Sequence, residues 1–244
     1  MIPYRLSLGV GAFFIAAVLG CGADPGDKLS TTTTVPLKEE KQLAEETKKV
    51  KLGKNITLEI QGKKKRVLVE AEVCLREGIL EQLLTRKRTK EHEAALAADI
   101  DVRDLHLALT LAGADAGKTV QFRPKLVAPS GTAVKVFLEY KKDGKVLRVP
   151  AQEWIRNIKT KKDFHADWVF AGSIFIPDPL DKTKKPYYGA NDGDVITVVN
   201  FESACLDVPF LSTKDNDDLF FEAHTARIPP LKTPVTVILE PQTK

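Results

Sequence analysis

Five residues between positions 74 and 106 have side chains that could do chemistry together. Lys90, His92 and Glu93 lie in the stretch TKEHEAAL, Cys74 precedes them and His106 follows them. Imidazole and thiolate groups are common metal ligands, and a histidine beside a thiol can activate it as a nucleophile. If their elements converge, Cys74, His92 and Glu93 would form a metal- or thiol-dependent site, with Lys90 and His106 as further members.

The spacing of these residues does not require such a site. A zinc metalloprotease needs His-Glu-x-x-His, because positions i and i+4 place both imidazoles on one helix face. Leu96 occupies the second histidine's position here. In the alternative interpretation, His92 is a solvated residue at a helix start and His106 a core residue of the LHLAL stretch. The sequence leaves both alternatives open.

Two other motifs predict no site. Ser173 lies in AGSIF, which lacks the closing glycine of the Gly-x-Ser-x-Gly nucleophile elbow. Acidic stretches at 99–104, 191–194 and 215–218 offer oxygen ligands, but none has the EF-hand order of residues. Asp and Asn are favoured in turns and helix caps, so we interpret these stretches as turns. We therefore predict no cofactor and assign no metal.

Aromatic residues gather between positions 154 and 188. Trp154, Trp168, Tyr187 and Tyr188 lie there, and the two tyrosines follow the proline-containing connection PDPLDKTKKP. Loops carry many binding residues, and exposed aromatics are frequent anchors of interfaces. These four residues are our candidate binding face, although aromatics in such a segment are more often part of the core.

The N-terminus predicts export and a lipid anchor. Arg5 is followed by an uncharged apolar run at 6–20, which suits a secretory signal and is short for a membrane span. The run ends in VLGC, which resembles the lipobox of bacterial lipoproteins, whose cysteine is acylated and becomes the mature N-terminus. We expect residues 1–20 to be a lipoprotein signal peptide and Cys21 to attach the chain to a membrane, facing the periplasm or the exterior. Gly22 favours the outer membrane, and an ordinary signal peptide is the alternative.

The rest of the chain divides into a tether and one domain. Residues 21–50 are polar and nearly free of aromatics, so we expect a disordered tether, and residues 51–244 are long enough for one core. Loss of residues 1–20 removes Arg5 and no acid, so the net charge changes from +4 to +3, which argues against a nucleic-acid partner. The basic runs at 62–66, 85–90 and 159–162 are typical of solvated turns. Cys74 and Cys205 could pair in an oxidising compartment, but nothing requires it.

The pattern of apolar residues predicts an α+β domain. Alternation favours strands at 55–60, 65–75 and 78–85, and helical spacing of Leu96, Ile100, Leu105 and Leu109 then predicts a helical block over 89–113. The chain returns to strands with a hairpin at 132–150 around Asp143-Gly144, one or two helical turns at 151–158, and strands at 167–178, 194–200, 219–228 and 233–240. We expect mainly antiparallel β-sheet with one helical block near residues 90–113.

Several sequence blocks, taken in order, resemble the YdjY-type domain of bacterial exported proteins. They are VEAEVCLREGILEQLLTRKRTKEHEAAL, VPAQEWIRN, WVFAGSIF, GDVITVVNF and LFFEAHTARIPPLKTPVTVIL. The resemblance implies one domain over nearly all of residues 51–244 and brings no established activity with it. We therefore predict an envelope lipoprotein whose domain binds a partner protein or small ligand without catalysis of its own. A metal- or thiol-dependent accessory function that uses Cys74, His92 and Glu93 is the alternative.

Overall fold

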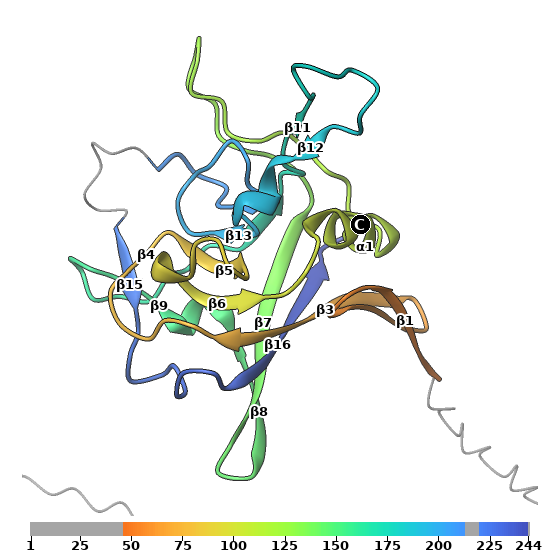
Figure 1. Cartoon of the computed structure of the whole chain (residues 1–244). Coiled ribbons are helices and arrows are strands. Elements are labelled where there is room, and N and C mark those ends of the chain that lie inside the picture. The colour runs from red at the N-terminus through yellow and green to blue at the C-terminus, as the bar shows by residue number, and fades with distance from the viewer. Residues whose placement is uncertain (1–45, 213–219, 244) are drawn as a thin grey trace, which may run out of the picture. The chain divides into compact units, whose positions relative to one another are not determined.

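The computed structural model describes residues 46–212 and 220–243, which belong to one compact unit, Ala44–Lys244 (Figure 1). The expected signal peptide, Cys21, most of the expected tether and the acidic stretch at 215–218 lie outside the described residues. Every buried residue of the hydrophobic core lies between Ile56 and Leu239. The core of the described residues therefore lies within this unit.

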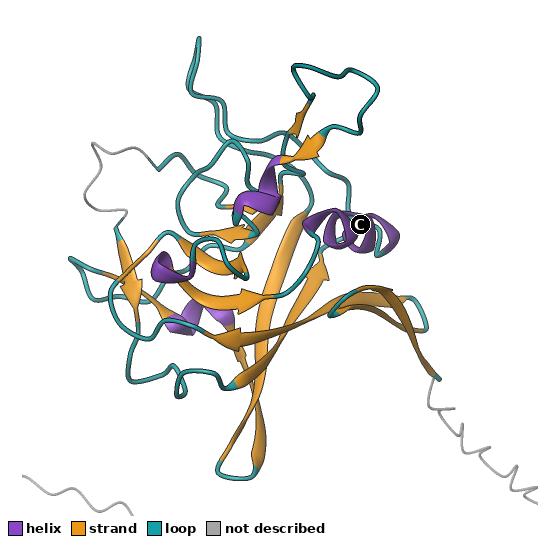
Figure 2. Ribbon diagram, in the orientation of Figure 1, coloured by secondary structure: helices purple, strands orange, loops and turns teal. Residues whose placement is uncertain are grey.

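Most of the regular structure is β-strand, with one α-helix in the described chain (Figure 2). The helix is α1 (Val102–Leu111), and short 3-10 turns occur at η1 (Glu91–Glu93), η2 (Ala151–Trp154) and η3 (Gly189–Asp192). The strands are β1 (Thr47–Gly53), β2 (Ile56–Gln61), β3 (Lys64–Val73), β4 (Ile79–Leu80), β5 (Gln82–Arg86), β6 (Ala94–Ala98), β7 (Ala133–Lys142), β8 (Lys145–Pro150), β9 (Ile155–Asn157), β10 (Trp168–Phe170), β11 (Phe175–Ile176), β12 (Tyr187–Tyr188), β13 (Ile196–Thr197), β14 (Leu206–Asp207), β15 (Phe221–Ala223) and β16 (Pro234–Pro241).

Eight strands close into a barrel. The order is β3-β16-β7-β10-β14-β13-β5-β6, and the ring closes because β6 also pairs with β3. Most pairs are antiparallel, but β5 with β6 and β13 with β14 are parallel. The strands β1, β2 and β8 extend the same sheet, and β4, β15 and β9 form a separate three-stranded sheet. The expected fold, mainly antiparallel sheet with a helical segment, is confirmed.

Alternating side chains build the barrel wall. On β16, Val235, Val237 and Leu239 are buried, and on the adjoining β3 Val67 and Val69 are completely buried. Successive residues of a strand point to opposite faces, so this alternation directs one face of each strand into the core. The register pairs Val237 with Val69 on one side and with Leu138 of β7 on the other. The last strand of the chain is therefore held between two earlier ones.

The expected helical block over 89–113 is wrong in its first half. Only α1, at Val102–Leu111, is α-helical, and Ala94–Ala98 form β6, which pairs in parallel with β5. All five residues of AALAA are buried. A short apolar run that is buried on both sides lacks the alternation of a half-exposed strand, so its pattern matches that of a helix. The preceding stretch TKEHE is a turn with η1 at its centre.

The hairpin at 132–150 is confirmed, whereas other predicted strands are shorter or divided. Asp143 and Gly144 have φ angles of 50° and 76°, in the left-handed region, and join β7 to β8. The predicted strand at 78–85 is split into β4 and β5, and that at 167–178 into β10 and β11. Residues 151–158 form the 3-10 turn η2 and then β9, instead of a purely helical segment.

The helix α1 packs beside the barrel through Val102, Leu105, Ala108 and Leu109, all of which are buried. Asp101 begins it, because its carboxylate accepts a hydrogen bond from the Arg103 amide at 3.0 Å. That bond and the Arg103 side chain hold the pKa of Asp101 well below its usual range. In the described chain, no helix is long and apolar enough to cross a membrane.

Candidate functional site

The stretch TKEHE turns the chain from β5 to β6. The Glu91 carboxylate accepts hydrogen bonds from the backbone N–H groups of Arg88 and Thr89, and these bonds fix the turn. As a result, Lys90 and Glu93 are partly buried, with 24% and 21% of their side chains exposed. His92 lies between them and is 77% exposed. The turn therefore sends the lysine inward and the histidine into solvent.

Lys90 is the centre of a partly buried polar network. Its Nζ atom lies 2.8 Å from Oδ1 of Asp194, whose side chain is only 4% exposed, and 4.2 Å from the centre of the Phe201 ring. Gln82 Nε2 donates to the same Asp194 oxygen at 2.9 Å, and the Ser203 hydroxyl donates to the other. Both oxygens of the buried carboxylate are therefore satisfied, and one of its partners is a cation.

Two carboxyl groups meet beside this network. Burial raises the pKa of Glu81 above its ordinary value, and the charge of Glu93 and a hydrogen bond with it raise the pKa further. The positive charge of Lys90 lowers the pKa of Glu81 and so opposes this effect. Lys90 Nζ lies 3.7 Å from Glu93 Oε1. The charge of Glu93 disfavours the ionised form of Glu81, because two adjacent carboxylates repel each other. The arrangement resembles a structural charge cluster, and it lies at the strand pairs β5–β6 and β13–β5.

The expected site of Cys74, His92 and Glu93 is only partly assembled. His92 Nε2 lies 3.7 Å from Glu93 Oε2. The Cys74 thiol instead donates to the Ala94 carbonyl at 3.0 Å, and in the described chain no hydrogen bond or ion pair joins it to His92. Burial, with a smaller contribution from the charge of Glu91, raises the pKa of Cys74 to about 12. Its thiol therefore stays protonated near neutral pH, which disfavours it as a nucleophile or metal ligand.

His106 occupies different surroundings from the TKEHE turn. Its Nδ1 atom lies 2.9 Å from the Tyr188 hydroxyl, and its ring centre lies 4.8 Å from that of Phe170. Burial lowers the pKa of His106. The Tyr188 hydroxyl also donates to the Gly172 carbonyl at 2.9 Å, so it connects α1 to the loop after β10. These contacts make His106 a packing residue of α1.

Within residues 46–212 and 220–243, no group of three or more His, Cys, Asp and Glu side chains is arranged to hold a metal ion. Cys74 and Cys205 are both free thiols there. Cys205 is completely buried, and burial raises its pKa to about 12.

The aromatic residues expected to form a binding face do not share an exposed surface. Trp154 and Trp168 are completely buried and Tyr188 is 1% exposed. The Trp168 indole donates to the Thr197 carbonyl at 2.6 Å, and the Trp154 ring packs against Tyr140. Tyr187, 44% exposed, is the one member that faces solvent. Three of the four residues are core, because η2 directs Trp154 inward and the strands β10 and β12 do the same for Trp168 and Tyr188.

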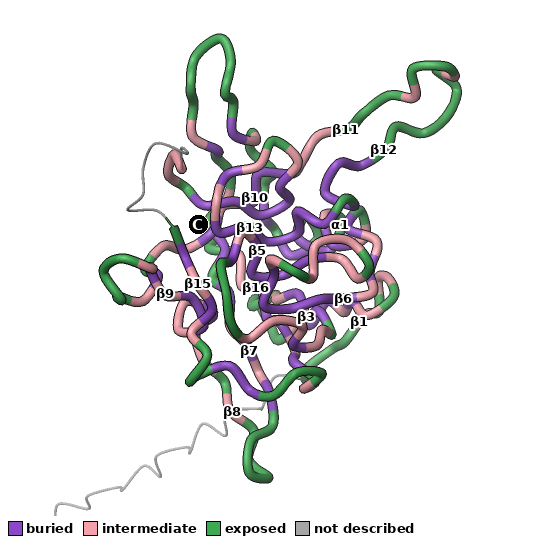
Figure 3. The backbone as a smooth tube through the Cα atoms, turned by 60° about the vertical axis from the view of Figure 1, so that its left-hand side comes forward, coloured by how far each residue is buried: buried purple, intermediate pink, exposed green. Residues whose placement is uncertain are grey.

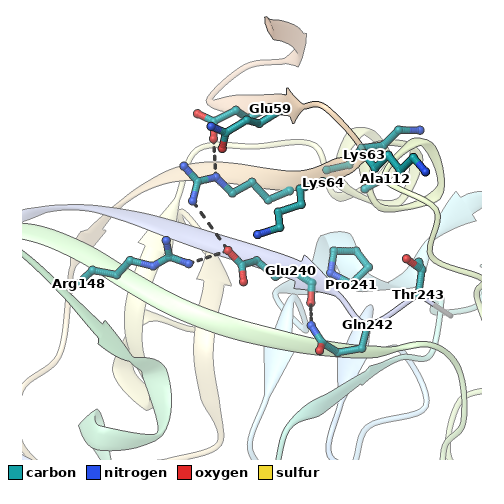
Figure 4. Close-up of a pocket in the computed structure, with 12 residues that line it drawn as sticks. Glu59, Lys63, Lys64, Ala112, Arg148, Glu240, Pro241, Gln242 and Thr243 are labelled. Atoms are coloured by element: carbon teal, nitrogen blue, oxygen red, sulfur yellow. Dashed lines mark hydrogen bonds and ion pairs between the residues drawn. The ribbon is translucent and has the colours of Figure 1, made fainter. Parts of the chain in front are cut away.

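The best-defined hollow with charged walls lies on another part of the domain (Figure 4). Its volume is about 530 Å³, within the range of small-molecule sites. It lies where the β2–β3 hairpin, the C-terminal end of α1 and the end of β16 meet. We call it the basic pocket. It is lined by Glu59, Gln61, Lys63, Lys64, Lys65, Arg66, Ala112, Arg148, Glu240, Pro241, Gln242 and Thr243.

Ion pairs hold the floor of the basic pocket in place. Arg148 Nη2 lies 2.6 Å from Glu240 Oε1, and Arg66 Nη1 lies 3.8 Å from the same oxygen. Arg66 Nε also donates to Glu59. Burial raises the pKa of Glu59, but its hydrogen bonds and ion pairs with Arg66 and Lys49 outweigh this effect and lower it. Both acids of the pocket are therefore paired with arginines.

Two lysines of the basic pocket have no such partner. Lys65 Nζ donates to the Leu111 carbonyl at the end of α1. For Lys63 and Lys64, by contrast, no acid lies within ion-pair distance in the part of the chain that the structure describes. Figure 4 shows both at the pocket rim. Five cations and two acids line the walls, so the pocket carries excess positive charge.

Sequence analysis interpreted the run at 62–66 as a solvated turn and missed this pocket. The run does form a turn, between β2 and β3. Arg148 and Glu240 join it only because β16 lies between β3 and β7. The basic run at 62–66 was the sequence feature that could have indicated the pocket. The order of the strands, however, decides whether such a run lines a pocket.

The family of the chain follows from comparison with known proteins. A sequence model of the YdjY domain matches residues 58–240. The chain belongs to the YdjY domain family. No curated protein and no solved structure matches it.

The YdjY domain match confirms the resemblance seen in the sequence blocks. It begins within β2 and ends within β16, so it spans every strand of the barrel. The Lys90 network and most of the basic pocket lie within the YdjY domain, whereas Pro241, Gln242 and Thr243 follow it. Membership establishes the domain and carries no activity with it.

Proposed function

We propose that this chain is an exported lipoprotein whose YdjY domain binds an anionic small ligand, or an anionic group of a partner protein, in the basic pocket. The domain does no chemistry of its own. The observation that carries the proposal is the pair Lys63 and Lys64, which stand without acidic partners at the rim of a pocket of about 530 Å³. A ligand with two or more carboxylate or phosphate groups would supply the missing negative charge.

The paired arginines support binding without large rearrangement. Arg66 and Arg148 are held by Glu59 and Glu240, so their positions are fixed before a ligand arrives. A fixed guanidinium loses less rotamer freedom on binding than a free one. Arg66 and Arg148 are therefore already in position to contact a ligand, and Lys63 and Lys64 add positive charge.

Binding is tested by titrating residues 44–244 with citrate and with pyrophosphate while backbone amide resonances are recorded. We expect saturable shifts of Lys63, Lys64, Gln242 and Thr243 that weaken as salt is added. The double variant Lys63→Gln/Lys64→Gln should lose roughly ten-fold in affinity. A matched double variant, Lys182→Gln/Lys185→Gln, removes the same charge from the 177–186 loop and should bind as the parent does. Absence of saturable shifts at the pocket with both probes would refute the proposal.

The lipid anchor is a separate part of the proposal and rests on VLGC at 18–21. Mass spectrometry of the chain purified from membranes should show an acylated N-terminal cysteine at position 21. Cys21→Ser should abolish the acylation and leave a chain that a high-salt wash removes from membranes, whereas the acylated parent should require detergent. The fold should persist, because the core of the described residues begins at Ile56. An unmodified chain cleaved elsewhere would overturn it. The sequence around Gly22 favours the outer membrane as the location.

A further inference from the structure

Two loops project beyond the barrel at the same end of the domain. One is the segment 117–131, and the other is 177–186 together with β11 and β12, from which it extends. Figures 1 and 3 are related by a rotation about the vertical axis, and both show the two loops extending upward past the barrel. One flat surface could therefore touch both loops at once.

The tips of these loops are apolar and exposed. On 117–131, Phe122, Leu126 and Val127 are 42%, 36% and 46% exposed. On the other loop, Leu180 is 94% exposed. Phe175, on β11 at the base of this loop, is 58% exposed although its ring packs against those of His106 and Tyr188. With Ile176 and Tyr187, these loops hold seven of the thirteen large exposed apolar side chains in the described chain. Such a concentration marks an interaction surface.

Cations surround the apolar tips. The first loop carries Lys118, Arg123 and Lys125 and no acid. The second carries Lys182, Lys184 and Lys185, with two acids whose oxygens are engaged within the loop. Asp178 pairs with Lys184 at 3.0 Å and accepts from the Leu180 amide, and Asp181 accepts from Thr183. The outward charge of both loops is therefore positive.

Both loops are shaped by internal bonds. Lys118 and Ser130 exchange backbone hydrogen bonds, and so do Gln121 and Val127. The second loop rests on the β11–β12 pair, in which Phe175 is opposite Tyr188. The apolar tips are thus held away from the core, instead of folding back onto it. Projecting tips fit a broad surface better than a small ligand, which requires a concave site.

We propose that the two loops dock this domain on an anionic lipid surface, with Phe122, Leu126 and Leu180 entering the interface and the lysines contacting headgroup phosphates. Apolar insertion combined with basic side chains is the pattern of interfacial membrane binding. The proposal goes beyond the ligand-binding function, uses none of the basic pocket and does not require an acylated Cys21.

The test is co-sedimentation of residues 44–244 with lipid vesicles. We expect binding to vesicles of phosphatidylcholine and phosphatidylglycerol in equal amounts, and little binding to phosphatidylcholine alone. Phe122→Asp/Leu180→Asp should reduce binding at least about ten-fold. Val146→Asp, which changes an exposed apolar residue of β8, should leave it unchanged. Loss of binding in both variants, or no binding to anionic vesicles, would overturn the proposal.

Charge variants separate this surface from the basic pocket. Lys125→Gln/Lys185→Gln should weaken vesicle binding by about five-fold for each lysine. Lys63→Gln/Lys64→Gln should leave vesicle binding unchanged while it weakens citrate binding. If vesicle binding depends on Lys63 and Lys64 instead, the pocket captures the headgroups and the loop proposal is wrong. If citrate binding fails and vesicle binding persists, the pocket proposal alone is wrong.

Discussion

Lys90 Nζ lies 2.8 Å from Oδ1 of Asp194, and this ion pair joins the turn before β6 to the chain entering β13. Removal of the cation leaves a carboxylate that is only 4% exposed without its charged partner. We expect Lys90→Met to lower the free energy of unfolding by about 2–4 kcal/mol, because an unpaired buried charge is costly. Urea denaturation monitored by tryptophan fluorescence measures this change.

A surface ion pair supplies the control for that measurement. Lys87 Nζ lies 2.9 Å from Glu72 Oε1, and both side chains are more exposed than those of Lys90 and Asp194. Lys87→Met should cost at most about 1 kcal/mol. Equal effects of the two substitutions would mean that the Lys90–Asp194 pair has no special structural role.

Asp207 predicts a pH dependence of stability. Burial raises its pKa to about 6, although Thr197, Asn200 and the Val208 amide donate hydrogen bonds to Oδ1. In an unfolded chain the pKa is about 3.9. Between these values the native protein holds a proton that the unfolded chain has lost, so stability falls as the pH rises from about 4 to 6.

Asp207→Asn should remove this contribution, which amounts to roughly 3 kcal/mol across that pH range. The measurement is the midpoint of urea denaturation at several pH values. Asp143→Asn, at the exposed β7–β8 turn, should keep the slope of the parent protein. A parental slope in Asp207→Asn would show that Asp207 is ionised in the native state.

The burial of the aromatic residues predicts unequal effects of substitution. Trp168→Ala should destabilise the domain by about 3–5 kcal/mol, because it opens a cavity and removes the hydrogen bond to Thr197. Tyr187→Ala should change stability by roughly 1 kcal/mol or less, since Tyr187 is 44% exposed. Thermal denaturation compares the two. A mild effect of Trp168→Ala would contradict its position in the core.

Glu240 predicts a gain of affinity in the basic pocket. Its carboxylate pairs with Arg148 and lies near Arg66. Glu240→Gln keeps an oxygen that can accept from Arg148, so the guanidinium groups stay in place while the pocket loses one negative charge. Citrate should bind several-fold more tightly, as judged by calorimetry. Glu222→Gln releases Arg156 and Lys161 on β9 and its following loop, away from the pocket, and should not alter binding. Unchanged or weaker binding by Glu240→Gln would mean that the arginines do not contact the ligand.

Long alternating runs were predictable from the sequence, and short buried runs were not. The stretches that became β3, β7, β8 and β16 alternate in type and are bounded by turn residues, so their strands were found. Ala94–Ala98 were assigned to a helix because Leu96 and Ile100 begin a series of apolar residues at helical spacing, and a fully buried run has no alternation that would indicate a strand. The parallel pairing with β5 that decides their conformation is a tertiary contact.

The candidate sites show the same division. Sequence analysis selected Lys90 and Glu93, and the structure joins them at 3.7 Å. Asp194, which pairs with Lys90, and Gln82, which donates to Asp194, carry no local signal. It also selected Trp154 and Trp168 for their chemistry, whereas burial depends on the direction in which η2 and β10 point these side chains. The sequence shows the type of each residue, but it does not show which residues become neighbours in the fold.

The position of β16 constrains how the chain acquires its structure. Val237 pairs with Val69 and with Leu138, so the last strand is the link between β3 and β7 in the closed ring. The ring therefore cannot close until nearly the whole chain is available, and its formation depends on contacts that are distant in sequence. A growing chain in which β16 has not yet been made cannot close the barrel, because β16 lies between β3 and β7. Such a chain lacks the stability of the closed ring. Under the export proposed above, the barrel would close only when translocation of the chain is almost finished.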